Sequence, residues 1–278
     1  MTITFTRKQG TSPLLISIPH AGRRIPPRIA ERMTEAALRL TDTDWYVRRL
    51  YDFASLAGAT VLAATYSRYL IDLNRSPDDE PLYEGQLKTG LCPLKTFAGE
   101  PVYKEGRKVG KKGMQHRVER YWRPYHAELQ DRLEQIREQF GYALLWDAHS
   151  IRGAVPSLFE GELPDLNIGT NGGKSCPKEV EDAVAEVAAK SPYTSVVNGR
   201  FTGGYITRHY GDPARNVFAM QLELAQRTYM NESTLRYDGR RAGELCVTLS
   251  DMLAAFRSSA ASVAARASTG TNRDLGVG

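Results

Sequence analysis

The chain has 278 residues, of which 41% are hydrophobic and 25% charged, so it can bury a substantial core. No apolar run approaches the ~20 residues that a membrane-spanning helix needs, and the opening stretch MTITFTRKQG lacks the apolar core of a signal peptide. We therefore expect a cytoplasmic protein with no membrane partner, built as one α/β domain.

The cysteines argue against a disulfide-stabilised fold, and the net charge leaves the class of binding partner open. Cys92, Cys176 and Cys246 lie far apart and show no paired spacing, which argues against disulfides and against a cysteine-ligated zinc site. The formal net charge of +5 suits a nucleic acid, a membrane surface or a small anionic substrate equally well.

The first third of the chain predicts strands and one helix. Residues 13–18 form an apolar run that ends abruptly at the loop containing His20, which is typical of a short buried strand. Apolar residues at helical spacing predict a helix over 42–57, with Thr41 or Asp42 as its cap. Further strands are expected over residues 60–65 and 69–73.

The middle of the chain begins with a long segment that shows no regular pattern. Residues 76–113 are rich in Pro, Gly and charge, so we expect an excursion over the surface of the kind that often forms a lid. A helix is predicted over 114–140, where apolar residues keep helical spacing, and a buried strand over 142–147.

The last third alternates again between helix and strand patterns. The predicted elements are a helix over 177–190, strands over 193–197 and 217–223, and a final helix over 241–265. Residues 268–278 have the composition of a disordered tail that follows a folded domain of residues 1–267.

This alternation predicts a mixed, mostly parallel sheet flanked by helices, which binds its ligands outside the carboxyl ends of its strands. Polar residues stand where the apolar strands end, namely His20, Arg75, Asp147, His149 and Glu223. One such residue is more often structural than functional. Several at the same sheet edge predict a site.

Two of these residues suit a metal. Hydrolytic zinc sites usually have three imidazole or carboxylate ligands from the protein, with the fourth position left for water. His20 and His149 supply imidazoles, and Asp42 or Asp44 could supply the carboxylate. Because Asp42 fits the role of a helix cap, Asp44 is the candidate ligand.

These residues lie in motifs that resemble those of the N-formylglutamate amidohydrolases. The motifs are His20 in SIPHAG, Asp44 in TDTDW, YSRYLIDLNR ending at Arg75, His149 in WDAHS, GGYITRHYG, and Glu223 in QLEL. The likeness covers roughly residues 12–255, and aspartoacylase, succinylglutamate desuccinylase and the zinc carboxypeptidases are similar more distantly. It implies a zinc-carboxypeptidase-like catalytic domain over residues 1–267.

The resemblance also implies roles for individual residues. One zinc ion would be held by His20, Asp44 and His149, a substrate carboxylate by Asn74 and Arg75, and the general base would be Glu223. This chain departs from the wider superfamily, in which a Glu three residues after the first His is the second ligand, because Arg23 stands there.

Three other basic features have alternative interpretations. His126, beside Tyr125 on the predicted long helix, could be a catalytic partner or a structural histidine. Arg208 follows a Gly pair and could bind a second substrate carboxylate. The basic run over 104–113 lacks the interleaved aromatics that stack bases, so we expect a solvated lid and no nucleic-acid partner.

The resemblance implies hydrolysis of the formamide of N-formyl-L-glutamate to formate and L-glutamate, at the end of a histidine degradation route. A small anionic N-acyl amino acid would then be the binding partner. Two alternatives remain open: a related amidohydrolase for another N-acyl amino acid or a peptidoglycan-type amide, and an inert anion-binding or nucleic-acid-binding protein on the same fold.

Overall fold

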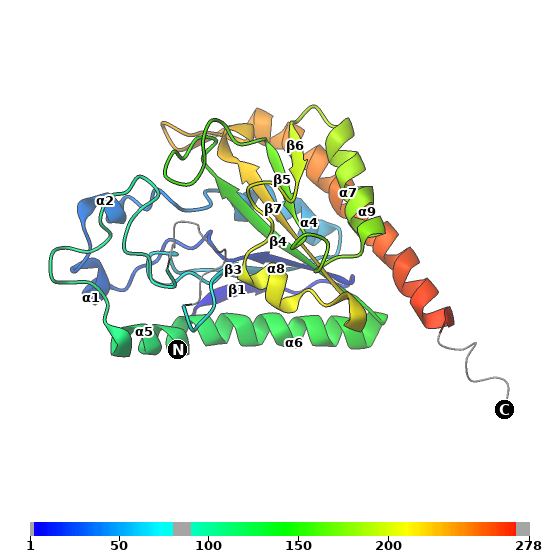
Figure 1. Ribbon diagram of the computed structural model, residues 1–278, viewed down its shortest axis with the longest axis horizontal. Coiled ribbons are helices and arrows are strands. Elements are labelled where there is room, and N and C mark those ends of the chain that lie inside the picture. The colour runs from blue at the N-terminus through cyan, green and yellow to red at the C-terminus, as the bar shows by residue number, and fades with distance from the viewer. Residues whose placement is uncertain (1–2, 80–89, 271–278) are drawn as a thin grey trace.

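The computed structural model describes residues 3–79 and 90–270, and at its centre is a seven-stranded sheet with helices on both faces (Figure 1). The strands in the order β1-β3-β2-β4-β7-β5-β6 are Phe5–Lys8, Thr60–Ala64, Leu14–Ile18, Ala143–Ile151, Val217–Ala225, Leu166–Gly169 and Ser195–Val197. A separate two-stranded ribbon consists of β8 (Met230–Asn231) and β9 (Arg236–Tyr237).

The sheet is mixed and mostly parallel, as predicted. β3, β2, β4 and β7 are neighbours that run in the same direction, whereas β1 is antiparallel to β3 and β5 is antiparallel to β7. β6 pairs with β5 in parallel. The four parallel strands therefore bring their carboxyl ends to one edge, where α/β sheets bind ligands.

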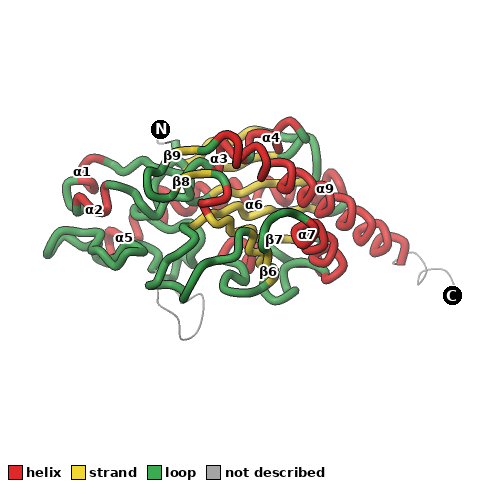
Figure 2. Tube along the Cα trace, turned by 90° about the horizontal axis from the view of Figure 1, so that it is seen from above, coloured by secondary structure: helices red, strands yellow, loops and turns green. Residues whose placement is uncertain are grey.

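Long helices cover the two faces of this sheet. α5, a π-helical turn and α6 follow one another along one face, and α7 packs against α9 on the other (Figures 1 and 2). The helices are α1 (Pro27–Ala30), α2 (Glu35–Leu38), α3 (Val47–Leu50), α4 (Asp52–Leu56), α5 (Lys111–Arg117), the π turn (Val118–Trp122), α6 (Arg123–Phe140), α7 (Lys178–Lys190), α8 (Tyr205–Tyr210) and α9 (Gly239–Gly270), with 3-10 turns at Pro213–Arg215 and Gln226–Thr228.

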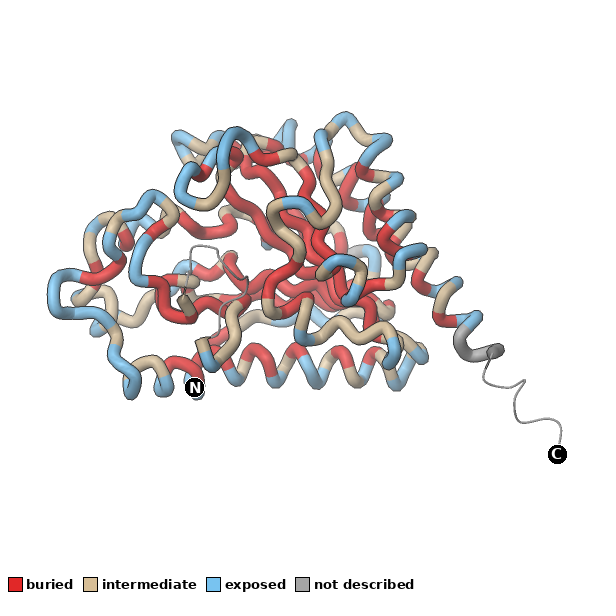
Figure 3. Tube along the Cα trace, in the orientation of Figure 1, coloured by how far each residue is buried: buried red, intermediate tan, exposed pale blue. Residues whose placement is uncertain are grey.

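The central strands are buried on both faces, so their side chains divide between two cores (Figure 3). In β4, Leu144 and Trp146 join the core under α7 and α9, and Leu145 joins the core over α6. Because side chains alternate along a strand, Asp147 and His149 lie on the same face as Leu145. The α6 face of the sheet thus changes from apolar to polar toward the carboxyl ends of its strands.

The helix predicted over 42–57 is wrong in its first part. The chain turns at Tyr46, whose φ of 61° is left-handed, and only the short helices α3 and α4 follow. Asp42 therefore caps no helix. Its Oδ2 accepts a hydrogen bond of 2.7 Å from the backbone N–H of Phe97.

The strand predicted over 69–73 is also absent, because these buried apolar residues form turns and a connecting segment. Their burial comes from packing under neighbouring loops and against the helical face, not from a place in the sheet. The sequence pattern missed β1, β5 and α8, which are short and carry few apolar residues.

The chain ends agree only in part with the prediction. α9 continues to Gly270, beyond the start of the predicted tail at residue 268, and residues 271–278 lie outside the described part. The same holds for residues 80–89 of the predicted surface excursion. Among the described helices, none combines the length and the apolar character needed to cross a bilayer.

Candidate active site

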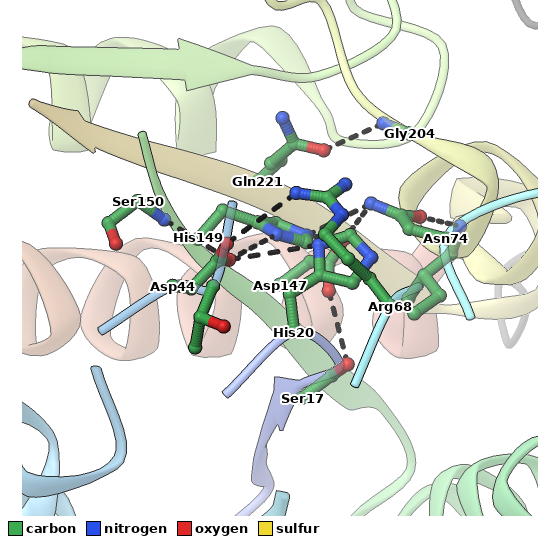
Figure 4. Close-up of polar contacts among 12 residues, drawn as sticks. Ser17, His20, Asp44, Arg68, Asn74, Asp147, His149, Ser150, Gly204 and Gln221 are labelled. Carbon is green, nitrogen blue, oxygen red and sulfur yellow. Dashed lines mark hydrogen bonds and ion pairs between the residues drawn. The ribbon is translucent and has the colours of Figure 1, made fainter. Parts of the chain in front are cut away.

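The structure brings three residues together that are far apart in the sequence. His20 follows β2, Asp44 lies just before α3, and His149 belongs to β4 (Figure 4). Each offers a possible ligand atom, these atoms all lie within 4.8 Å of one another, and all three side chains are buried. The Oδ2 of Asp44 is 3.0 Å from Nδ1 of His149 and 3.7 Å from Nδ1 of His20.

Two local contacts hold these loops in place. The N–H of Asp44 donates to the carbonyl of His20 at 3.2 Å, which ties the two loops together. At Gly22 a Cβ atom would stand 2.1 Å from the carbonyl oxygen of Tyr66, so only glycine allows this close approach. The Gly of the SIPHAG motif thus sets the path of the loop that carries His20.

Each histidine is oriented by a carboxyl group on its far side. Nε2 of His20 lies 2.7 Å from Oδ1 of Asp72, and Nε2 of His149 lies 3.0 Å from Oδ2 of Asp147. A carboxylate only accepts hydrogen bonds, so Nε2 of each ring carries a hydrogen. Nδ1 of His149 also lies 3.0 Å from Oδ2 of Asp44, so this ring donates from both nitrogens to carboxylates. Both Nδ1 atoms face Asp44 and, once deprotonated, could bind a metal there, as in carboxylate–histidine–metal arrangements.

One buried guanidinium balances part of this negative charge. Arg68 contacts Oδ2 of Asp72 at 3.0 Å and lies 3.7 Å from Oδ1 of Asp44. Burial alone would raise the pKa of Asp72, but His20 and Arg68 hold it well below its usual range. Burial likewise opposes the charge of Asp44, but its hydrogen bond with His149 lowers its pKa overall.

The two imidazoles respond differently to their surroundings. Burial lowers the pKa of His20, and the nearby Arg68 adds to that effect. Burial would also lower the pKa of His149, but Asp147 and Asp44 raise it well above its usual range. The cluster therefore favours positive charge beside Asp44 and Asp147, and its donor set of two imidazole nitrogens and one carboxylate fits a hydrolytic zinc ion.

Glu223 stands beside this cluster. It faces His149 across the parallel pairing of β4 and β7, and only 8% of it is exposed. Burial raises the pKa of its carboxyl to about 8. No hydrogen bond from the described residues reaches that carboxyl group, so it is available to take up and release a proton.

Asn74 is tied into the fold at both ends of its amide. Its Oδ1 accepts a 2.8 Å hydrogen bond from the N–H of Ile206, and its Nδ2 donates to Oδ2 of Asp147 at 3.2 Å. Nδ2 also lies 2.9 Å from Nε2 of His149, but two N–H groups form no hydrogen bond. A Cβ atom at Gly204 would stand 2.2 Å from this Nδ2, so the second Gly of the GGYITRHYG segment lets the backbone close on Asn74.

Two half-buried arginines flank this contact. Nη1 of Arg75 donates to the carbonyl of Asn74 at 2.9 Å. Arg208 donates from Nε to the carbonyl of Gly203 and from Nη2 to Oγ1 of Thr202, both at 2.8 Å. The guanidinium groups predicted to bind substrate thus lie on segments that meet at Asn74.

His126 has both ring nitrogens in hydrogen bonds within the fold. Nε2 lies 2.9 Å from the carbonyl oxygen of Leu73 and Nδ1 lies 2.9 Å from the hydroxyl of Tyr210. The ring stacks on Trp122 with centroids 3.7 Å apart, and burial lowers its pKa to about 3. This arrangement favours the structural role over the catalytic one that the sequence left open.

The sequence reasoning assigned no role to several polar residues of the site. Arg68, Asp72 and Asp147 are among them, and so is Gln221, whose Oε1 accepts a 2.7 Å hydrogen bond from the N–H of Gly204. Asp147 was predicted at the sheet edge but without a role. Strand alternation could have found Gln221, since it stands two residues before Glu223 and faces the same way. Arg68 offered no comparable signal.

Comparison with known proteins finds relatives in one enzyme family. The sequence profile of the family described as N-formylglutamate amidohydrolase matches residues 12–230. An N-formylglutamate deformylase of Pseudomonas putida is 54% identical over 226 residues, which cover 81% of this chain and 84% of that protein. The deformylase of Pseudomonas aeruginosa is 52% identical over 226 residues, with 81% and 85% covered.

Solved structures share the fold. The crystal structure of an N-formylglutamate amidohydrolase from Ralstonia eutropha superimposes with a TM-score of 0.80 at 27% identity, covering 91% of this chain and 98% of that one. A gene product of Agrobacterium tumefaciens has a TM-score of 0.67 at 17% identity, covering 90% and 95%, which supports the fold alone. The chain therefore belongs to the N-formylglutamate amidohydrolase family, as its motifs predicted.

Proposed function

We propose that this protein hydrolyses the formamide of N-formyl-L-glutamate to formate and L-glutamate, with one zinc ion held by His20, Asp44 and His149. The observation that carries the proposal is the buried cluster of two oriented imidazoles and one carboxylate beside Glu223. The family and the deformylases that share more than half of their aligned residues with this chain support the choice of substrate.

The metal accounts for the reactivity of water in this proposal. Bound at such a site, zinc acidifies a water molecule and polarises an amide carbonyl. His20, Asp44 and His149 would hold the ion, and Asp72 and Asp147 would keep the two imidazoles oriented for it through their hydrogen bonds with Nε2. The two imidazoles are thus oriented before a metal binds.

Glu223 acts as the general base and then as the general acid. Its carboxyl group would accept a proton from the attacking water and pass it to the nitrogen of the departing amine, which must leave protonated. Burial raises the pKa of this carboxyl, which favours the protonated form after the water has given up its proton and before the amine nitrogen accepts it.

Arg75 and Arg208 bind the substrate carboxylates. N-formylglutamate carries two carboxylates, and a guanidinium group binds a carboxylate through two parallel hydrogen bonds. Asn74 and His126 serve as positioning residues in this scheme, because their polar atoms already hold the neighbouring segments. We also propose that this reaction stands at the end of a histidine degradation route in the cytoplasm, as the resemblance of the motifs implies.

A substrate panel tests the proposed reaction. N-formyl, N-acetyl and N-succinyl derivatives of glutamate and aspartate are incubated with the zinc-loaded protein, and release of free amino acid is measured. We expect the highest kcat/KM with N-formyl-L-glutamate. A clear preference for a larger acyl group would assign the protein to another N-acyl amino acid instead.

A further inference from the structure

A second cavity, of about 520 Å³, lies behind the loops that carry His20 and Asp44 and is rich in arginine. Four of its lining residues are arginines, in the pairs Arg23–Arg24 and Arg48–Arg49. The first pair follows the SIPHAG loop, and the second lies on α3. Asp52 is the one acidic residue among those that line the cavity.

These arginines carry an unbalanced positive charge. Within the described chain, no ion pair joins any of the four guanidinium groups to a carboxylate, although many other arginines, such as Arg68 and Arg227, form one. Like charges that gather around one cavity attract an anion and repel one another without it. An anionic ligand is therefore the chemistry that this cavity fits.

The two arginine pairs stand on ordered backbone, and aromatic rings hold two of the side chains. The N–H groups of Arg23 and Arg24 both donate to the carbonyl of Thr65, at 3.1 and 3.0 Å. The guanidinium of Arg23 lies 5.5 Å from the centre of the Trp45 ring. This cation–π contact restrains the exposed Arg23 side chain beside the cavity.

Arg49 is held in the same way, with its guanidinium 4.1 Å from the centre of the Tyr237 ring. Trp45 and Tyr46 are half-buried and line the cavity beside the arginines. The volume is much larger than one inorganic anion requires, so an organic group attached to the anion could lie against these rings.

We infer that this cavity binds a phosphate group, either free phosphate or the phosphate of a small phosphorylated metabolite. Guanidinium groups bind phosphate through paired, charge-assisted hydrogen bonds, and adjacent arginine pairs present several such donors. This site is separate from the catalytic cluster and does not depend on the proposed reaction. Its walls include Ala21 and Thr43, so an occupied cavity also stabilises the segments next to His20 and Asp44.

Calorimetric titration at fixed ionic strength tests this inference on the zinc-loaded protein. The probes are inorganic phosphate, adenosine 5′-monophosphate and adenosine. We expect one phosphate-dependent site per chain with a Kd of about 1 mM or tighter. Tighter binding of the nucleotide than of phosphate identifies a phosphorylated metabolite as the ligand, whereas equal binding identifies free phosphate.

Matched double variants locate the binding. Arg24→Gln with Arg48→Gln should weaken binding by about tenfold or more and leave zinc content and turnover unchanged. Lys111→Gln with Lys112→Gln removes the same charge from exposed residues of α5 and should leave binding as in the parent. The inference is wrong if the parent binds neither phosphate nor the nucleotide, if only adenosine binds, or if both double variants bind like the parent.

Discussion

Asp147 acts at the scale of one residue by fixing the tautomer of His149. It is fully buried and accepts hydrogen bonds from Ser17, Asn74 and His149. Asp147→Asn keeps the shape but replaces one accepting oxygen with an NH₂ group, so Nε2 of His149 loses its charged acceptor. Zinc affinity, measured by chelator competition, should fall about 10- to 100-fold.

A matched change elsewhere gives the control for Asp147. Asp131→Asn removes the same charge from an exposed position on α6 and should leave the zinc affinity unchanged. Equal zinc affinity in the Asp147 variant and the parent would contradict the orienting role.

Substitution of Asp42 and of Asp44 should have different effects on zinc content and stability. Asp44→Ala should lose bound zinc, as should His20→Ala or His149→Ala, because each removes a ligand. Asp42→Ala should keep its zinc but lose about 1–3 kcal/mol in the free energy of unfolding, since the N–H of half-buried Phe97 loses its acceptor. Metal analysis together with denaturant unfolding distinguishes them, and the reverse pattern would make Asp42 the ligand.

Glu223 and Arg75 should affect different kinetic constants. A general base is needed only when charge moves, so Glu223→Gln should retain zinc while kcat falls by about 10² or more. In the proposed reaction Arg75 would bind a carboxylate that is present in substrate and transition state alike, so Arg75→Ala should chiefly raise KM. Loss of zinc from the Glu223 variant, or turnover near the parent rate, would exclude the proposed role.

At the scale of elements, His126 joins the long helical face to the segment that carries Asn74 and Arg75. Burial lowers its pKa to about 3, below the ~6.5 of the unfolded chain. Between these values only the unfolded chain takes up the proton. The contribution of the buried neutral His126 ring to the free energy of unfolding is therefore complete above about pH 6.5. It is lost as the pH falls toward 3.

A single substitution isolates this pH dependence. His126→Gln can still donate a hydrogen bond to the carbonyl of Leu73 but cannot be protonated. The fall in the free energy of unfolding between pH 7 and pH 5 should be smaller in the variant by roughly 2 kcal/mol, as denaturant titrations would measure. An identical fall in the free energy of unfolding of parent and variant would contradict the burial of a neutral His126 ring. A kcat of His126→Gln reduced as far as that of Glu223→Gln would instead assign His126 a catalytic role.

The sequence predicted the helices and strands whose apolar residues repeat at helix or strand spacing, because this repeat marks a face buried between the sheet and its helices. β2, β3, β4, β7 and the helices α6, α7 and α9 all carry sustained apolar periodicity, and each was predicted. The prediction over 69–73 was wrong because an apolar run reports burial but not hydrogen-bond partners. The prediction of one helix over 42–57 was wrong because no residue near Tyr46 indicated the left-handed turn there.

The candidate site was predictable in its residue types but not in its contacts. Strand ends and motifs pointed to His20, His149 and Glu223, which the structure places together. Asn74 hydrogen-bonds Ile206, and His126 hydrogen-bonds Leu73 and Tyr210. These partners come into contact only in the tertiary fold. The arginine-lined cavity likewise joins segments that no pattern connects.

At the scale of the whole molecule, the four parallel strands bring the residues of the candidate site together. Their carboxyl ends place His20, His149 and Glu223 at one edge, and the connecting segments add Asp44 and Arg68 from above that edge. Charge and hydrogen bonding inside this cluster favour a bound cation. We therefore expect turnover of N-formyl-L-glutamate to require a metal ion bound by this cluster.

Zinc titration of the metal-stripped protein tests that claim most directly. Formate release from N-formyl-L-glutamate is measured after each addition of zinc. The expected result is almost no turnover without metal and a linear rise that stops at about one zinc ion per chain, as expected for a single three-ligand site. Full turnover by the metal-stripped protein, or no formate from the fully loaded protein, would contradict the account.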